Sequence, residues 1–303
     1  MKILISGASG LIGQAISRDL SRQGHEIVAL QRTPSAKPPT WDIDAGIINL
    51  GEQRNIDAVI HLAGENIAAG RWSQERKAAI RRSRIVGTTV LAEQLLQLDR
   101  KPEVFIVCSA VGFYGHRPGE TLTEESPGGS GFLAEVCREW EAAARIAEQA
   151  EIRVVNLRLG MVLSRDGGAL KKMLQPFKLG LGGIIGHGEQ LISWIAIDDV
   201  VGAISHILEN GQFSGPVNVV SPSPVTNRVF TKTLGRVLKR PTIIPLPTFL
   251  AKILFGEMAE ELLLSSTRAL PEKLQKFGYE FRYPDLDRAL MAHMPDVLQS
   301  RDV

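Results

Sequence analysis

Residues 2–13 read KILISGASGLIG, a short apolar run followed by glycines at positions 7, 10 and 13. The run Lys2–Ser6 has the length and composition of a buried strand. From Leu11 the apolar residues recur at helical spacing, and this pattern ends at Gly24. The opening of the chain therefore predicts a strand, a glycine-rich turn and a helix, in that order.

Each glycine of this turn has a separate physical use. Gly7 permits the tight turn, Gly10 lets the backbone approach a pyrophosphate, and Gly13 lets the helix pack closely on the strand. The start of the helix adds free N–H groups and a partial positive charge, which favour an anion. The turn predicts a dinucleotide-binding site whose residues are Gly7, Ser9, Gly10, Leu11, Ile12 and Gly13.

Strands and helices alternate through the rest of the first half. The expected strands are Glu26–Gln31, Ile47–Leu50, Ala58–Leu62, Val104–Ser109 and Val154–Leu163, and the expected helices are Ser73–Leu98 and Phe132–Ala150. Strands that are apolar along their whole length call for a parallel sheet covered on both faces. We expect an α/β fold, a Rossmann-type doubly wound parallel sheet over residues 1–165.

The second half changes in composition. Residues 180–188 hold five glycines in nine positions and predict a loop, which with Trp194 would form a lid and wall of a substrate pocket. Residues 192–220 contain two strand patterns, Ile192–Ile197 and Val217–Val220, around a helix at Asp199–Glu209, and we assign this segment to the sheet domain. Residues 166–191 and 221–303, with a helix at Thr226–Leu238, predict a smaller C-terminal substrate lobe.

Composition excludes several functions. The chain has 303 residues, 44% of them hydrophobic, and a net charge of +2, which is too small to indicate nucleic acid or an anionic membrane. No apolar run approaches the ~20 residues needed to span a bilayer. Cys108 and Cys137 form neither a disulfide framework nor a zinc motif. We expect a cytoplasmic protein without a metal site, with a small molecule as its partner.

The end of the second strand indicates which dinucleotide binds. An acidic residue there would bind the ribose 2′-hydroxyl of NAD, but the strand ends Leu30-Gln31-Arg32 without a carboxylate. Arg32 can pair with a 2′-phosphate instead, so the sequence favours NADP over NAD. The alternative is a solvated arginine at a strand end. After the fourth strand, the small residues Ala63 and Gly64 would let the ribose of the nucleotide lie against the backbone, and Leu62 just before them is a further cofactor-binding position.

Several motifs together resemble the extended short-chain dehydrogenase/reductase superfamily, and within it an uncharacterised epimerase-like branch. They are the glycine turn, HLAG (61–64), GENIAAGRW (64–72), SAVGFYG (109–115), FLAEVCREWEAAA (132–144), LRLGMVLSRDGGAL (157–170) and IAIDDV (195–200). The resemblance covers nearly the whole chain. It implies an NAD(P)-dependent reductase or epimerase, and superfamily members often dimerise through the two long helices, so we expect a monomer or a homodimer.

The chain departs from this superfamily at its catalytic positions. The resemblance calls for a tyrosine with a lysine four residues later, but positions 118, 283 and 287, four beyond the three tyrosines, are Pro118, Tyr283 and Asp287. The tyrosine is the acid/base of these enzymes and the lysine lowers its pKa. Arg84 stands where the superfamily has an asparagine, and it would bind nucleotide phosphates or an acidic substrate.

Other side chains at the carboxyl ends of the strands offer replacements. Glu65 is our first choice as general acid/base, Tyr114 is a second proton donor, and Ser109 stands beside the position of the superfamily serine. Asn66, His187 and Trp194 are candidate substrate contacts. Each candidate also has a purely structural interpretation. Glu65 would cap the loop or the next helix, Tyr114 would be a packed aromatic side chain, and His187 would simply be exposed.

Two functions remain open from the sequence. One is an NADP-dependent oxidoreductase or epimerase acting on a small carbonyl or sugar-like substrate through a relocated acid/base, and hydride transfer itself needs only a positioned nicotinamide. The other is a non-catalytic NADP(H)-binding redox sensor or partner-binding scaffold. The glycine-rich loop and tryptophans favour a second ligand, and with it the enzyme.

Overall fold

The computed structural model describes residues 1–32 and 37–294. Its centre is an eight-stranded sheet in which every neighbouring pair is parallel except the last. The strands, in spatial order, are β12 (Gly215–Val219), β8 (Arg153–Leu159), β6 (Val104–Ala110), β5 (Ala58–His61), β1 (Lys2–Ser6), β2 (Glu26–Arg32), β3 (Thr40–Asp42) and β4 (Ile47–Asn49). From β1 the chain first adds β2, β3 and β4 on one side of the sheet and then β5, β6, β8 and β12 on the other. The switch point of this doubly wound fold therefore lies between β1 and β5.

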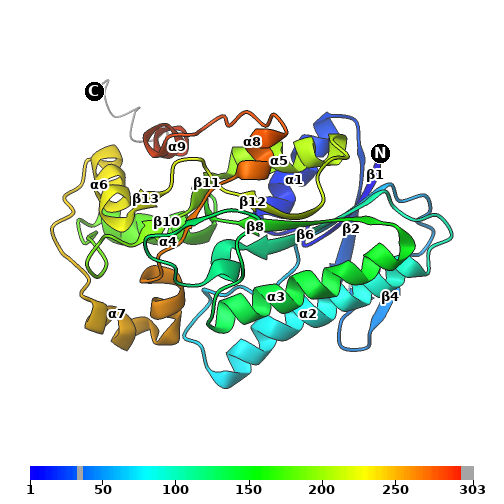
Figure 1. Cartoon of the computed structure of the whole chain (residues 1–303), viewed down its shortest axis with the longest axis horizontal. Helices are drawn as coiled ribbons and strands as arrows, with labels where there is room; N and C mark the ends of the chain where they lie inside the picture. The colour runs from blue at the N-terminus through cyan, green and yellow to red at the C-terminus, as the bar shows by residue number, and fades with distance from the viewer. Residues whose placement is uncertain (33–36, 295–303) are drawn as a thin grey trace.

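Helices cover both faces of this sheet (Figure 1). α1 (Leu11–Arg22) and α5 (Ile197–Glu209) lie on one face. α2 (Gln74–Leu96) and α3 (Phe132–Ala144), which continues as the 3-10 turn Arg145–Ala150, lie side by side on the other. The predicted α/β Rossmann-type class is therefore confirmed.

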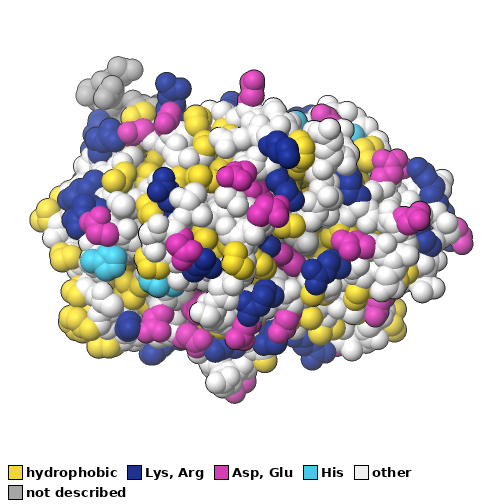
Figure 2. Space-filling model, viewed as in Figure 1, with side chains coloured by type: hydrophobic (Ala, Val, Ile, Leu, Met, Phe, Trp, Pro, Cys, Tyr) yellow, Lys and Arg dark blue, Asp and Glu magenta, His cyan; other side chains and the backbone are white. Residues whose placement is uncertain are grey.

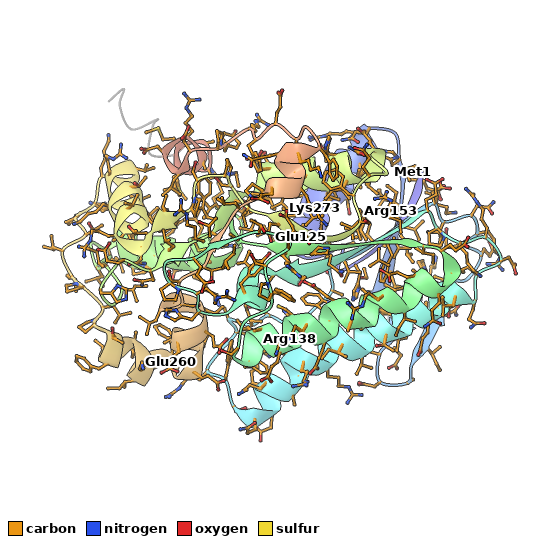
Figure 3. The ribbon with its side chains drawn as sticks, viewed as in Figure 1. Met1, Glu125, Arg138, Arg153, Glu260 and Lys273 are labelled. Atoms are coloured by element: carbon orange, nitrogen blue, oxygen red, sulfur yellow. The ribbon has the colours of Figure 1, made fainter. Side chains whose placement is uncertain are left out.

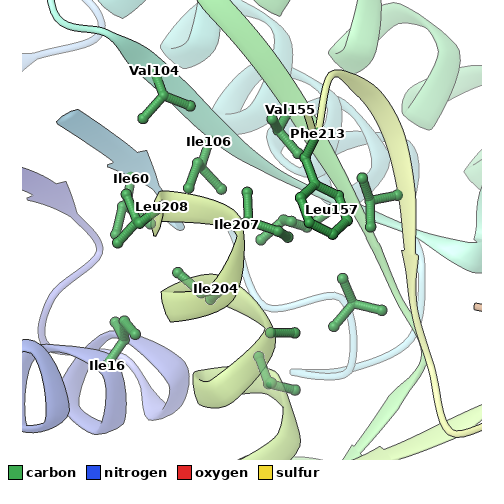
Figure 4. Packing of buried hydrophobic residues seen from close by; sticks show 14 of the residues in the cluster. Ile16, Ile60, Val104, Ile106, Val155, Leu157, Ile204, Ile207, Leu208 and Phe213 are labelled. Carbon is green, nitrogen blue, oxygen red and sulfur yellow. The ribbon is translucent and has the colours of Figure 1, made fainter. Parts of the chain in front are cut away.

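Two apolar cores explain why the strands are apolar on both sides. In β1, Ile3 and Ile5 pack toward α1 and α5, whereas Leu4 between them packs toward α2 and α3. Successive side chains of a strand point to opposite faces, so a strand with helices on both sides needs no polar positions. Figure 4 shows the first core, where Ile16 of α1 and Ile204 of α5 meet Ile60 and Ile106 of the sheet.

The C-terminal lobe is built from short pieces. Its strand pairs are β9 (Met161–Leu163) with β11 (Trp194–Ala196), β10 (Leu191–Ile192) with β13 (Val225–Thr226), and β7 (Thr121–Leu122) with β14 (Arg268–Ala269). Its helices are α4 (Gly168–Lys178), α6 (Asn227–Leu238), α7 (Thr248–Phe255), the π turn η3 (Ala259–Leu263), α8 (Glu272–Lys276) and α9 (Leu286–Ala292). A separate apolar cluster, which includes Trp194, Phe230 and Leu290, holds β11, α4, α6 and α9 together, whereas Leu274 of α8 packs on the core of the central sheet.

The structure corrects some predicted boundaries. The strand expected at 154–163 divides at Gly160, where a Cβ would lie 2.6 Å from the Ser193 carbonyl oxygen, and β9 leaves the sheet to pair with β11. The strand expected at 192–197 divides at Ser193 and contributes nothing to the central sheet. β3 was not predicted, because three residues carry no periodicity. Ser73 caps α2 rather than belonging to it, since its Oγ accepts from Arg76 N.

The surface carries both signs of charge. On the face in Figure 2, Lys and Arg side chains are interspersed with Asp and Glu. Within residues 1–32 and 37–294, no helix is both long enough and apolar enough to cross a bilayer.

Candidate functional site

The glycine turn between β1 and α1 is as tight as its sequence suggests. Gly7 has a φ of +75°, and a Cβ at this position would lie 2.8 Å from Ala63 N, in the segment that follows β5. At Gly13 a Cβ would lie 2.1 Å from the Gly7 carbonyl oxygen. Because a methyl group fits at neither position, both glycines are required by the backbone itself.

The N-terminus of α1 is open. Gly10 is its N-cap and offers no side chain to the first N–H groups of the helix, at Leu11 and Ile12. Ser9 and Gly10 are exposed, while Gly13 is buried beneath them. Uncapped N–H groups together with the helix dipole favour an anion, so these residues fit the pyrophosphate of a dinucleotide.

Arg32 ends β2 on the same edge of the sheet. β1 and β2 run parallel, with Ser6 opposite Leu30, so the end of β2 lies beside the glycine turn. The side chain of Arg32 is exposed. Its position allows it to reach a group on the adenosine side of a nucleotide bound at α1.

His61, at the end of β5, has a packing role. It is fully buried, its Nδ1 lies 2.5 Å from Ser6 Oγ, and its ring meets Trp41 edge-on at 5.7 Å. Burial lowers the pKa of this imidazole to about 3, so it is neutral at physiological pH. The residues that follow are more open: Leu62 and Ala63 are partly buried and Gly64 is exposed.

Glu65 and Asn66 follow β5 at the carboxyl edge of the sheet. Glu65 Oε1 accepts a hydrogen bond of 2.8 Å from Arg76 Nη1, and its side chain remains 38% exposed. The Glu65 N–H donates to Ser83 Oγ at 3.0 Å, which fixes the backbone there. Asn66 is exposed, and its Oδ1 accepts from Ala68 N at 2.9 Å. Glu65 is thus accessible to a ligand while a guanidinium holds it in place.

Tyr114 and Ser109 face inward, contrary to the expectation that they meet a substrate. Tyr114 is fully buried, its hydroxyl lies 2.7 Å from Asn218 Oδ1, and it accepts from Arg158 Nη1 at 3.0 Å. Burial raises the pKa of this phenol to about 12. Ser109 is 2% exposed and donates to Glu141 Oε1 at 2.8 Å. Neither hydroxyl is placed to exchange a proton with a bound molecule.

Both hydroxyls belong to a buried ionic cluster that sequence reasoning missed. Arg158 of β8 forms a bidentate pair with Glu141 of α3, with Nε–Oε1 and Nη2–Oε2 distances of 2.9 Å. Its guanidinium also lies 3.5 Å from the centre of the Phe113 ring. The signal was present in the sequence, since Arg158 stands in a mainly apolar strand and a buried arginine requires a partner.

Arg84 of α2 reaches the carboxyl ends of β5 and β6. Its Nη1 donates to the carbonyl oxygens of Glu65 and Ile80, at 3.1 Å each. A Cβ on Gly64 would lie 3.4 Å from its Cζ, and the Trp140 ring lies 5.0 Å from it. Desolvation lowers the pKa of the guanidinium, so burying this charge has a free-energy cost.

A second residue that sequence reasoning missed comes from the lobe. Glu261 of η3 accepts from Phe132 N and Leu133 N, at 3.3 Å each, and so caps α3. Partial burial raises the pKa of this carboxyl. Figure 3 labels Glu260, its neighbour, on the part of the lobe next to α3. This contact spans nearly 130 residues, and no local pattern announces it.

Trp194 and His187, the two substrate contacts expected on the lobe, have other surroundings than predicted. Trp194 is fully buried and donates from Nε1 to the Ser223 carbonyl at 2.8 Å, so it packs the lobe and lines no crevice. His187 is exposed, and its Nδ1 accepts from Glu189 N at 3.0 Å. The loop 180–188 is also not a free lid, because Gly186 N and the Ile184 carbonyl pair with Leu246.

The two cysteines are weakly reactive thiols. Cys108 and Cys137 are free thiols, and burial raises their pKa values to about 12 and about 11. Such thiols are poor nucleophiles. Among the described residues there is no group of three or more His, Cys, Asp or Glu that could hold a metal ion.

A glycine turn at an open helix N-terminus, set at the switch point of a parallel sheet, defines a dinucleotide-binding protein of the Rossmann type. Residues 3–220 match the NAD dependent epimerase/dehydratase family, and the chain belongs to that family. Residues 246–292 match a domain of unknown function, DUF1731. The predicted superfamily is therefore confirmed.

Individual relatives share nearly the whole chain. An epimerase family protein of Mycobacterium bovis is 39% identical over 290 residues, which cover 95% of this chain and 96% of the relative. The crystal structure of the human epimerase family protein SDR39U1 with NADPH is 35% identical, has a TM-score of 0.90, and covers 98% of this chain and 100% of its own. A nucleoside-diphosphate sugar epimerase from Corynebacterium glutamicum is 37% identical with a TM-score of 0.79, covering 97% of this chain and 57% of its own.

Proposed function

We propose that this chain binds NADP(H) across the carboxyl edge of its sheet and acts as an oxidoreductase or epimerase on a small carbonyl or sugar-like substrate. The observation that carries the proposal is the open N-terminus of α1 behind a turn in which Gly7 and Gly13 leave no room for a side chain. The NADPH in the human relative's structure supports the same cofactor here.

Different residues would bind different parts of the nucleotide. The N–H groups at Leu11 and Ile12 would bind the pyrophosphate, and Arg32 would pair with the 2′-phosphate of the adenosine half. Since Arg32 lies on the β2 side of β1, the nicotinamide half extends the other way, over Ala63 and Gly64 at the end of β5. When bound, NADP(H) supplies or accepts a hydride.

Glu65 is the side chain that best fits proton transfer. It lies at the end of β5, is reachable from the crevice, and is held by Arg76. Reduction of a carbonyl adds a hydride to carbon and a proton to oxygen, and Glu65 would deliver that proton directly or through one water. In an epimerase the same carboxylate would take the proton when the alcohol is oxidised and return it after the intermediate ketone turns over.

A non-catalytic NADP(H)-binding protein is the second function, and one observation favours it. α3 contains neither a tyrosine nor a lysine. The hydroxyls of Tyr114 and Ser109 are hydrogen-bonded within the buried ionic cluster around Arg158. A change in nicotinamide absorbance that depends on an added carbonyl compound distinguishes the enzyme from this alternative.

The cofactor assignment has a direct test. Purified protein is titrated with NADPH and with NADH while nicotinamide fluorescence is followed, in wild type, in Arg32→Ala and in Arg22→Ala, which removes an exposed cation from α1 as a control. Charge-assisted hydrogen bonds contribute about 1.5–3 kcal/mol, so Arg32→Ala should weaken NADPH about 10- to 100-fold and leave NADH unchanged. Equal binding of both nucleotides by the wild type would contradict the role of Arg32.

A further inference from the structure

Arg84 carries a charge that the described part of the chain leaves without a carboxylate partner. Its only hydrogen bonds there leave from Nη1, to the carbonyls of Glu65 and Ile80. One guanidinium nitrogen is thereby saturated, because Nη1 has two hydrogens and two acceptors. The Nε–Nη2 edge keeps three N–H groups with no acceptor among the described residues.

The carboxylate that acts on Arg84 is already engaged. Glu65 raises the pKa of the Arg84 guanidinium, but its own Oε1 pairs with Arg76. His61, another titratable neighbour, is neutral because burial lowers its pKa to about 3. A partly buried guanidinium needs a counterion, and the groups beside it are either neutral or already paired. An anion supplied by a ligand would therefore stabilise the charge of Arg84.

The position of Arg84 excludes the cofactor's phosphates as that anion. The pyrophosphate belongs at α1, beside β1, and the 2′-phosphate belongs beyond it, beside β2. Arg84 stands on the opposite side, at the ends of β5 and β6. Its electrostatic neighbours there are the thiols of Cys108 and Cys137 and the charged side chains of Glu65 and Arg76. Neighbouring strands are about 4.8 Å apart, so the ends of β5 and β6 lie one and two strand spacings from β1.

We infer that the Nε–Nη2 edge of Arg84 binds the carboxylate of the substrate, and that this protein acts on a small carbonyl or hydroxy compound that bears a carboxylate. This inference rests on the proposed function for the location of the nicotinamide. The edge is planar and presents two parallel donors, which match a carboxylate bidentately. The Trp140 ring lies 5.0 Å from the Arg84 Cζ, and Gly64 leaves room for the guanidinium because a Cβ there would lie 3.4 Å from that atom.

The test uses oxamate as a carboxylate probe, its neutral diamide oxamide as the isostere, and inorganic phosphate. Each is titrated into the protein with and without saturating NADPH, with thermal stability and nicotinamide fluorescence as readouts. The variants are Arg84→Gln, Arg84→Lys and the control Arg82→Ala, which removes a cation paired with Asp44 from the solvent side of the same helix. Circular dichroism identifies a variant that fails to fold. If Arg84→Gln does not fold, the comparison rests on Arg84→Lys, which keeps the positive charge but loses the planar pair of donors.

We expect oxamate to bind the wild type and Arg82→Ala, with affinity reduced about 10- to 100-fold in Arg84→Gln, since a charge-assisted pair contributes about 1.5–3 kcal/mol. Oxamide should bind neither protein, and NADPH affinity should stay the same in all variants. Oxamate binding that ignores Arg84, phosphate binding as tight as oxamate, or a loss of NADPH affinity in Arg84→Gln would each overturn the inference. If NADPH does not bind while oxamate still binds through Arg84, the proposed cofactor fails and the carboxylate site stands.

Discussion

Loss of the Glu141 carboxylate should destabilise this protein more than loss of any exposed carboxylate on the same helix. Glu141 is 7% exposed and pairs bidentately with Arg158, which is 3% exposed. Glu141→Gln keeps the volume but leaves the guanidinium as a buried charge without a counterion. Removing one partner of a buried pair typically costs about 3–5 kcal/mol.

This free energy converts to a measurable melting shift. Unfolding entropy is about 2.1 cal/mol/K per residue, which for 303 residues places the expected fall in Tm at about 5–8 °C. The control is Glu139→Gln on α3, whose partner Arg81 is 44% exposed, and which should shift Tm by no more than about 1 °C. The double variant Glu141→Leu with Arg158→Met removes both charges and should recover most of the loss.

Differential scanning calorimetry of the four proteins at neutral pH measures these shifts. Equal shifts for Glu141→Gln and Glu139→Gln would refute the reasoning, because burial would then add nothing to the pair. A double variant as unstable as the single one would instead assign the loss to packing.

Three further outcomes can be measured on the same preparation. Gly13→Ala should abolish NADPH binding in fluorescence titrations, because its Cβ would lie 2.1 Å from a backbone oxygen, whereas Gly211→Ala, with nothing within 4 Å, should bind normally. The folded pKa of His61, about 3, lies below its usual 6.5, so the unfolded chain takes up the proton first and stability is lost as pH falls from 6.5 toward 3. The free energy of unfolding then falls by up to about 1.4 kcal/mol per pH unit. Between pH 7 and pH 5, the fall in Tm should be smaller in His61→Gln than in the wild type. Equal falls in the two proteins would contradict this role of His61. Cys137, which is 4% exposed, should react with a disulfide reagent only after unfolding, and rapid labelling of Cys137 in the native protein would contradict its burial.

Elements whose signal is local were predictable. β1, β5 and β6 are apolar on both faces, and that property alone identifies central strands of a covered parallel sheet. The glycine turn was equally readable, since backbone contacts at Gly7 and Gly13 impose the residue type. Element boundaries were less accurate where one residue redirects the chain, as at Gly160, because the reason lies in Ser193, which is distant in sequence.

The order of residues along the chain thus established the fold class, the cofactor turn and the family, because short-range periodicity and backbone sterics act within a few residues. Packing alone decided which polar side chains face a ligand. Tyr114 turned inward toward Asn218 and Arg158, while Glu261 came from the lobe to α3. Arg84 has no ion-pair partner among the described residues, because the nearby Glu65 carboxylate pairs with Arg76. A buried polar group takes whichever partner the tertiary structure brings within about 3 Å, and sequence distance carries no information on that choice.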